Sequence, residues 1–261
     1  MPTACAAFDA RNFTVFYQPR FALTPGEPTM TRAEALLRRA DNVDAPVFPL
    51  IAQAERDGHI GALTEFVARR VCRAINQMLW AVGFSPCISI NISPALLQNK
   101  VFINNLRALI KSHSVDPQMI EFEITESCNV DDYSNARSCC DALRDDGFGL
   151  ALDDFGTGLS GLRRLDMFPV SAIKLDRHFI GGIGVRQTSE IIVSTTADIA
   201  RQFGITAVAE GIETEHQLNH VIRCGYQEAQ GFMLARPMPL RDLLMHLHRQ
   251  DNQLQPHTLA L

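Results

Sequence analysis

A modified (β/α)8 TIM-like barrel, an α/β fold with one antiparallel strand near the N-terminus, is the architecture that this sequence predicts. The 261 residues suit this class, in which a single domain of about 250 residues is usual. Short β-rich runs alternate with longer helical patterns, which favours parallel strands joined by helices. The first two strand runs are separated by a turn too short for a crossover helix, so these two strands should be antiparallel.

Each element of the barrel has its own signal in the sequence. Runs with the composition of strands lie at 13–23, 29–37, 87–93, 120–125, 149–155, 172–176, 205–211 and 226–231. Helical patterns cover about 48–81, the stretches up to about 113 and 146, a short segment after 155, about 188–204, the segment after 211, and 239–250. Because no linker divides the chain, we expect residues 1–250 to form one barrel domain and 251–261 to form a frayed tail.

Composition and charge narrow the classes of function. Apolar residues make up 46% of the chain, charged residues 20%, and the net charge is −5, which argues against wholesale disorder and against binding of long nucleic acid. The seven cysteines are odd in number and form no C-x-x-C pair, which favours reduced thiols in a cytoplasmic protein. The sequence shows neither a signal peptide nor an apolar run long enough to span a membrane.

Polar side chains recur near the carboxyl ends of seven successive predicted strands. They are Glu34, Asn91, Glu123, the pair Asp153 and Asp154, Lys174, Glu210 and Gln230. One such residue alone is usually a solvated loop residue or a helix cap. Seven strands with an acid, amide or amine at the same end indicate a common site, because barrel enzymes gather their chemistry at this end.

The carboxylates of this series predict bound cations. Glu34, Glu123, Asp153, Asp154 and Glu210 would repel one another on one rim unless cations neutralised them. Oxygen donors select hard divalent ions, Mg²⁺ or Mn²⁺, rather than zinc. Adjacent aspartates suit a pair of ions roughly 3.5–4 Å apart, an arrangement that activates a water in phosphoester cleavage.

A glycine pattern offers a competing interpretation. Gly156, Gly158 and Gly161 follow a strand run and precede a helical run in G-x-G-x-x-G order, which is the context of a dinucleotide-binding fold. Asp153 and Asp154 would, however, place negative charge beside the pyrophosphate. We therefore interpret the glycines as a pliant loop beyond a metal-binding strand, able to close over a substrate phosphate.

An ordered series of motifs resembles the EAL domain, a family of bacterial phosphodiesterases of cyclic di-GMP. The motifs, which cover about residues 13–245, are "YQP" (17–19), "EALLR" (34–38), "NIS" (91–93), "EITES" (123–127), "DDFGTG" (153–158), "KLD" (174–176), "AEGIET" (209–214) and "QGF" (230–232). The resemblance implies a modified barrel with one antiparallel strand. It also implies hydrolysis of cyclic di-GMP to linear pGpG with two Mg²⁺ or Mn²⁺ ions, and a homodimer.

The resemblance also implies roles for individual residues. Metal ligands would be Glu34, Asn91, Glu123, Asp153 and Asp154; the catalytic residues would be Lys174, which orients the attacking water, and Glu210, a general base or a ligand of a metal-bound water. Substrate contacts would come from Gln18, Arg38, Glu213 and Gln230, and loop anchoring from Glu126, Gly156, Thr157 and Gly158. By their residue types alone, Arg38 could equally form an exposed ion pair and Gln18 a satisfied core amide.

Four positions depart from the family pattern. Arg39 stands where a tryptophan is expected, Arg32 where a small residue is usual, Leu159 in place of a loop tyrosine and Ser171 in place of an aspartate. None of them removes a metal ligand or the lysine, so they bear on substrate affinity and loop position.

The alternative function is a catalytically silent regulator of the same fold that binds cyclic di-GMP or a protein partner.

Overall fold

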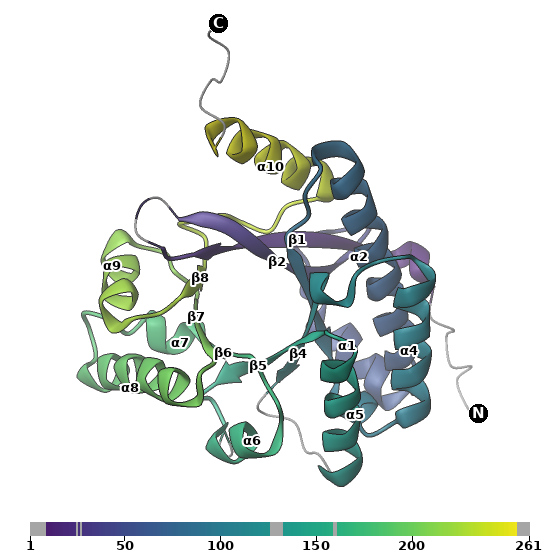
Figure 1. Ribbon diagram of the computed structural model, residues 1–261, viewed down its shortest axis with the longest axis horizontal. Coiled ribbons are helices and arrows are strands. Elements are labelled where there is room, and N and C mark those ends of the chain that lie inside the picture. The colour runs from purple at the N-terminus through teal and green to yellow at the C-terminus, as the bar shows by residue number, and fades with distance from the viewer. Residues whose placement is uncertain (1–8, 25, 27, 126–132, 159–160, 255–261) are drawn as a thin grey trace, which may run out of the picture.

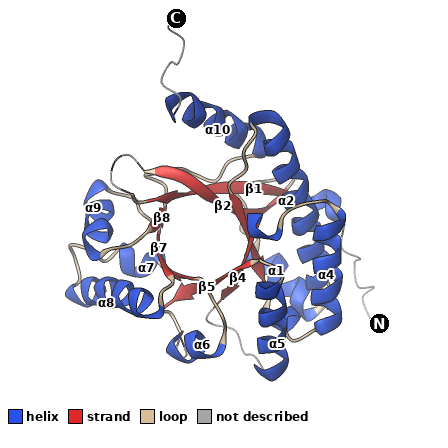
Figure 2. Ribbon diagram, viewed as in Figure 1, coloured by secondary structure: helices blue, strands red, loops and turns tan. Residues whose placement is uncertain are grey.

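The fold is seen in a computed structural model, which describes residues 9–24, 26, 28–125, 133–158 and 161–254, with side chains up to residue 250. Within these residues, eight strands form a closed barrel in the order β1 to β8 (Figure 1). Helices surround the barrel on its outside (Figure 2). The predicted (β/α)8 architecture is therefore confirmed, and the closed sheet is not the open doubly wound sheet of a dinucleotide-binding fold.

The strands begin and end within two residues of the predicted bounds. They are β1 (Phe13–Ala22), β2 (Thr29–Arg39), β3 (Cys87–Ile92), β4 (Ile120–Thr125), β5 (Gly149–Phe155), β6 (Ala172–Leu175), β7 (Thr206–Glu210) and β8 (Glu228–Gln230). The helices are α1 (Phe48–Arg56), α2 (Ile60–Val82), α3 (Pro94–Leu97), α4 (Lys100–Ser112), α5 (Tyr133–Asp145), α6 (Gly161–Met167), α7 (Arg177–Ile180), α8 (Gln187–Phe203), α9 (Glu215–Cys224) and α10 (Leu240–Leu254), with short 3₁₀ helices at Ala10–Asn12 and Pro117–Met119.

Strand β1 is the antiparallel strand. It pairs antiparallel with β2 and with β8, whereas neighbouring strands from β2 to β8 pair in parallel. The carboxyl ends of the parallel strands therefore meet at one rim. Because β1 runs the other way, Gln18 lies opposite Glu34 near this rim, and Arg20 lies opposite Arg32 deeper in the barrel.

Inward-facing side chains form two layers, with the two members on each strand two residues apart, as alternation along a strand requires. The upper layer consists of Gln18, Glu34, Asn91, Glu123, Asp153, Lys174, Glu210 and Gln230. The lower layer consists of Arg20, Arg32, Ser89, Glu121, Ala151, Ala172, Val208 and Glu228. In the lower layer, Ala151, Ala172 and Val208 pack as a small apolar cluster, and the remaining strands contribute polar side chains. All eight members of the upper layer are predicted site residues.

The predicted helical region over about 48–81 contains two helices in the structure. Within it, α1 ends at Arg56 and α2 begins at Ile60. Gly58 separates them with φ +73°, a left-handed conformation that favours glycine and ends helices. A pattern of apolar residues that runs through this glycine concealed the break. Among the described residues, no helix combines the length and apolar character needed to cross a bilayer.

The last helix is longer than predicted. α10 continues to Leu254, so residues 251–254 are helical rather than frayed, and the rest of the predicted tail lies outside the described residues. Between 251 and 254 there is neither glycine nor proline, and the first helix-breaking residue is Pro256. A proline disfavours helical backbone in the residue before it. Since no such residue occurs within 251–254, the helix can continue to Leu254.

Gly231 is expected to be the least replaceable glycine of the barrel rim. A Cβ at Gly231 would overlap the backbone nitrogen and oxygen of Ile212, and Ile212 N donates to Gln230 O at 3.1 Å. We expect Gly231→Ala to lower the free energy of unfolding by about 3 kcal/mol, because backbone cannot move aside as a side chain can. Urea denaturation measures the loss.

The matched control for Gly231 is Gly204→Ala. Gly204 ends α8 with φ +67°, and a Cβ added there would meet open space, so only the conformational cost of about 1 kcal/mol applies. Equal losses in the two variants would contradict the overlap with Ile212.

Candidate functional site

Lys174 lies at the centre of the upper layer and is fully buried. Its Nζ is 2.7 Å from Glu210 Oε1, 2.8 Å from Glu123 Oε2, 3.1 Å from Asp153 Oδ1 and 3.7 Å from Glu34 Oε2. These residues come from β2, β4, β5, β6 and β7. The structure thus brings four of the predicted carboxylates into one ring around the ammonium group of the predicted Lys174.

Two amides fix the carboxylate of Glu34 in this ring. Asn91 Nδ2 donates to Glu34 Oε1 at 3.0 Å, and Gln230 Nε2 donates to Glu34 Oε2 at 2.9 Å. One hydrogen bond on each oxygen holds the carboxylate in a single orientation. Both amides were predicted site residues, and β3 and β8 bring them to opposite sides of Glu34.

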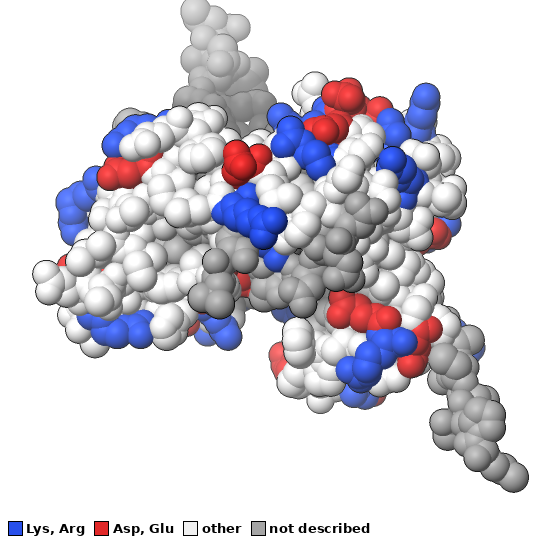
Figure 3. Space-filling view, turned by 90° about the horizontal axis from the view of Figure 1, so that it is seen from below, with Lys and Arg blue, Asp and Glu red and all other residues white. Residues whose placement is uncertain are grey.

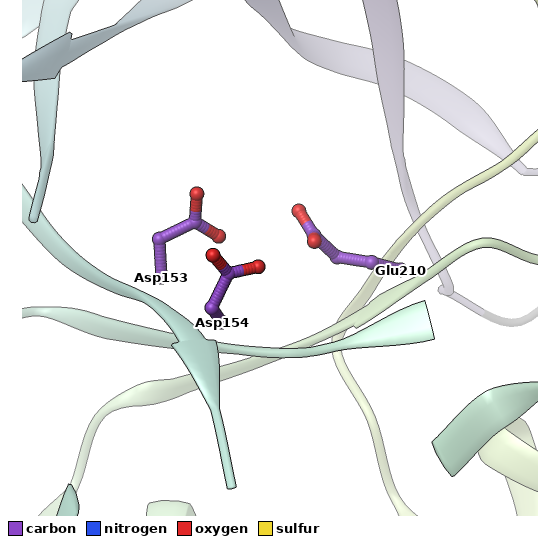
Figure 4. A group of neighbouring side chains, drawn as sticks. All are labelled: Asp153, Asp154 and Glu210. Atoms are coloured by element: carbon purple, nitrogen blue, oxygen red, sulfur yellow. The ribbon is translucent and has the colours of Figure 1, made fainter. Parts of the chain in front are cut away.

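The adjacent aspartates point into the same space because β5 is irregular. Neighbouring side chains normally alternate between the two faces of a strand. Here the pairing of β5 with β6 shifts register between Leu152 and Phe155, and Asp154 adopts φ 55°, a left-handed conformation uncommon for aspartate. As a result one oxygen each of Asp153, Asp154 and Glu210 lie within 4.8 Å of one another (Figure 4).

Burial and mutual repulsion set the charges of the site. Burial raises the pKa of Glu210 to about 8, against the opposing charge of Lys174, and raises that of Asp154 to about 6 with a further contribution from Asp153. Burial also raises the pKa of Glu123. For Glu34, burial is outweighed by Lys174 and by the two amides, so its pKa is lowered. The carboxylates keep the pKa of Lys174 high despite its burial.

The donor set fits divalent cations. Both carboxylate oxygens of Glu123 and Oδ1 of Asp153 are buried, and beyond their ion pairs with Lys174 and Arg20 no hydrogen bond to them is seen among the described residues. One ammonium group faces four carboxylates, so the ring retains excess negative charge wherever these groups are ionised. Oxygen donors with unused lone pairs and excess negative charge are what Mg²⁺ and Mn²⁺ bind.

A cavity of about 440 Å³ opens above the ring. The predicted substrate residues Gln18, Arg38, Glu213 and Gln230 line it together with Glu34, Asp153, Asp154 and Glu210. The sequence interpretation missed Asp176 and Arg177, which also line it. A second, more apolar cavity of about 510 Å³ shares Arg38, Asp153 and Asp154 with the first. The site therefore continues outward past Arg38.

The structure bears on the alternatives for Gln18 and Arg38. Gln18 is buried and its Nε2 donates to Ala235 O at 3.2 Å, so it is a satisfied amide that also lines the cavity. Arg38 is half-buried and its Nη1 donates to Leu37 O at 2.8 Å. The ion pairs of the described residues do not include Arg38, so the exposed ion pair is not seen.

The loop after β5 is partly described. Thr157 donates to Asp154 O through its backbone nitrogen at 3.2 Å and through Oγ1 at 2.8 Å, which supports the left-handed Asp154. Gly156 has φ 93°, and a Cβ there would lie 2.8 Å from the Phe179 ring. Gly158 is half-buried. Glu126 and Leu159 lie outside the described residues, so the anchoring of this loop by Glu126 stays a prediction.

Comparison with known proteins decides the family. The model of the family described as "EAL domain" matches residues 4–237. This chain belongs to the EAL domain family. It is 34% identical over 240 residues to the bifunctional diguanylate cyclase/cyclic di-GMP phosphodiesterase MucR of Pseudomonas aeruginosa, covering 91% of this chain and 35% of MucR. The EAL domain thus spans about a third of the length of that relative.

Two solved structures share the fold of this EAL domain. One is the PaMucR phosphodiesterase in complex with cyclic di-GMP, with a TM-score of 0.80 and 32% identity, covering 89% of this chain and 94% of that one. The other is the manganese and cyclic di-GMP complex of BlrP1 from Klebsiella pneumoniae, with a TM-score of 0.75 and 27% identity, covering 91% of this chain and 59% of that one.

The departures of this EAL domain from the family pattern have different structural roles. Arg39 pairs with Asp41 at 2.6 Å on the surface, and Ser171 Oγ donates to Leu150 O at 3.0 Å. Arg32 instead enters the barrel, where it joins a buried group that the sequence interpretation missed, Arg20, Glu121 and Glu228. The signal was present, since each of the four lies two residues from a predicted upper-layer residue.

Proposed function

We propose that this EAL domain is a metal-dependent phosphodiesterase that hydrolyses cyclic di-GMP to linear pGpG and so lowers this second messenger in bacterial signalling. The ring around Lys174, with four carboxylates within 3.7 Å of its ammonium, is the observation that carries the proposal. The phosphodiesterase PaMucR in complex with cyclic di-GMP supports the substrate. The manganese complex of BlrP1 supports the metal.

Two Mg²⁺ or Mn²⁺ ions are the cofactors of the proposed reaction. Glu34, Asn91, Glu123 and Asp153 would hold the first ion, and Asp153 and Asp154 would hold the second. The left-handed backbone of Asp154 turns the carboxylates of both adjacent residues toward this site. When bound, the ions polarise the phosphate, lower the pKa of the attacking water and stabilise the leaving oxygen.

Hydrolysis adds one water across one phosphoester. The water oxygen bonds to phosphorus, the bond from phosphorus to the ribose 3′ oxygen breaks, and the leaving 3′ oxygen takes up the second proton of the attacking water. Lys174 donates a hydrogen bond to the attacking water and orients it. Glu210, whose Oε1 lies 2.7 Å from Lys174 Nζ, accepts one proton of this water as the general base. Glu213 and Gln230 support the second ion and the substrate.

The nucleotide occupies the cavity above the ring. Gln18 and Arg38 face it, and the guanidinium of Arg38 suits a phosphate because its donors form a planar fork. On the face shown in Figure 3, basic and acidic residues lie in small mixed groups. A continuous basic track, which long nucleic acid requires, is not seen among the described residues of that face, in keeping with a small nucleotide ligand. Formation of a homodimer stays a prediction.

Metal removal tests the proposed function. Purified protein with cyclic di-GMP and Mn²⁺ is expected to release pGpG, and EDTA is expected to slow this reaction by at least about a hundredfold, because the ions supply several kcal/mol of transition-state stabilisation. Excess Mg²⁺ or Mn²⁺ should restore it. Chromatography of the nucleotides measures both. Cyclic di-GMP that binds, measured by calorimetry, yet stays intact with either metal would contradict the enzyme and support the silent regulator.

A further inference from the structure

The lower layer holds a buried charge network that the proposed reaction does not use. Arg20 is fully buried; its Nη2 lies 2.6 Å from Glu121 Oε1 and its Nε lies 2.9 Å from Glu228 Oε2. Arg32 reaches the same two carboxylates from the amino-terminal end of the barrel, at 3.3 and 3.0 Å. Ser89 Oγ donates to Glu121 Oε1 at 2.9 Å. Two positive and two negative side chains therefore balance beneath the site.

Arg20 connects this network to the upper layer. Its remaining donor, Nη1, lies 3.6 Å from Glu123 Oε1, and the two side chains are 2% and 0% exposed. Neither atom has a hydrogen-bond partner among the described residues. The other oxygen of Glu123, Oε2, lies 2.8 Å from Lys174 Nζ. Glu123 is thus held between a cation below and a cation above, with one oxygen turned to each.

The orientation of Arg20 is fixed by its lower partners. Glu121 and Glu228 contact two nitrogens of one planar guanidinium, Nη2 and Nε, so the position of the third nitrogen is determined as well. That nitrogen, Nη1, faces Glu123. Because β4 places Glu121 and Glu123 two residues apart on the inward face, a single arginine can contact both.

We propose that Arg20 is a positioning residue for the metal ligand Glu123, holding Oε1 from inside the barrel so that Oε2 stays turned toward the ring around Lys174. This inference rests on the proposed function, in which Glu123 binds a cation. Partners that orient metal ligands contribute about 10–100-fold to metal affinity or activity. Since Arg20 lies below the ring and not in the wall of the cavity, its contribution should be to metal binding and not to substrate binding.

Two substitutions distinguish positioning of Glu123 by Arg20 from a contribution of Arg20 to the stability of the barrel alone. Arg20→Lys keeps the positive charge but replaces the planar guanidinium with a single ammonium. One ammonium cannot contact Glu121, Glu228 and Glu123 at the same time. Arg32→Gln removes the other cation of the network, and the ion pairs of Arg32 among the described residues do not include Glu123. Both variants lose buried ion pairs with the same carboxylates.

Calorimetric titration with Mn²⁺ alone, without nucleotide, gives the direct readout. We expect Arg20→Lys to weaken Mn²⁺ binding by about 10–100-fold and to raise the Mn²⁺ concentration for half-maximal hydrolysis equally, while the KM for cyclic di-GMP changes less than about threefold. Arg32→Gln should lower stability in urea and leave Mn²⁺ affinity within about threefold of the parent. If Arg20→Lys does not fold, the double variant Arg20→Met with Glu121→Gln replaces it in the same titration. This double variant removes one charge of each sign, so the network stays balanced.

The outcomes distinguish this inference from the function on which it rests. Unchanged Mn²⁺ affinity in the Arg20 variant, or an equal loss in both variants, would overturn the positioning role and leave the metal site standing. Absence of Mn²⁺ binding to the parent protein would overturn the metal site, and the role of Arg20 with it.

Discussion

Glu34→Gln is expected to slow hydrolysis of cyclic di-GMP by roughly a thousandfold, because a metal ligand that supports several kcal/mol of transition-state stabilisation becomes neutral. The replacement keeps the shape of the side chain, and its amide oxygen can still accept one of the bonds that Asn91 and Gln230 make to Glu34 at 3.0 and 2.9 Å. We therefore expect the fold to survive. Initial rates with saturating Mn²⁺, followed by chromatography of pGpG, measure the effect.

Glu65→Gln is the matched control for this substitution. Glu65 forms an exposed pair with Arg69 along α2 at 3.3 Å, so the same chemical change there should alter the rate less than about twofold. An unchanged rate in Glu34→Gln, with a circular dichroism spectrum like that of the parent, would remove Glu34 from the metal site.

Lys174→Met is expected to abolish turnover and to destabilise the metal-free protein as well. Glu34, Glu123, Asp153 and Glu210 would lose the ammonium that lies within 3.7 Å of each. Loss of one partner of a buried ion pair costs about 3–5 kcal/mol, and we expect a loss of this size in urea denaturation with EDTA present. Mn²⁺ should return part of the stability, by about 2.7 kcal/mol at a hundred times its Kd.

Two observations check this role of Lys174. Lys111→Met, on an exposed position of α4, removes the same charge and should cost less than about 0.5 kcal/mol. Stability of Lys174→Met equal to that of the parent in EDTA would show that the ammonium does not hold the carboxylates together. A variant that still hydrolyses cyclic di-GMP at the rate of the parent would exclude Lys174 from orienting the attacking water.

The sequence predicted the barrel because its signals are local. Alternation of strand and helix patterns and the short turn between β1 and β2 follow from propensity and chain length. The division between α1 and α2 was missed because it depends on the left-handed backbone of Gly58, whereas the apolar pattern continues across it. Hydrophobic periodicity does not report a single φ angle.

The upper layer was predicted because polar residues are unusual at the ends of buried strands, and here they recur on seven successive strands. What the sequence could not supply was the direction of Asp154, since strict alternation would have turned it away from Asp153. The register shift in β5 reverses that expectation. The lower layer was missed because polar residues at strand ends indicate only the rim, whereas Arg20, Glu121 and Glu228 lie two residues away from it along their strands.

A crystal structure of the protein with Mn²⁺ and cyclic di-GMP tests the central claim most directly. We predict two anomalous peaks roughly 3.5–4 Å apart, one among Glu34, Asn91, Glu123 and Asp153 and one at Asp153 and Asp154, with a phosphate of the nucleotide at both. Crystals saturated with Mn²⁺ that show no peak between these side chains, with Lys174 still holding the carboxylates, would contradict it.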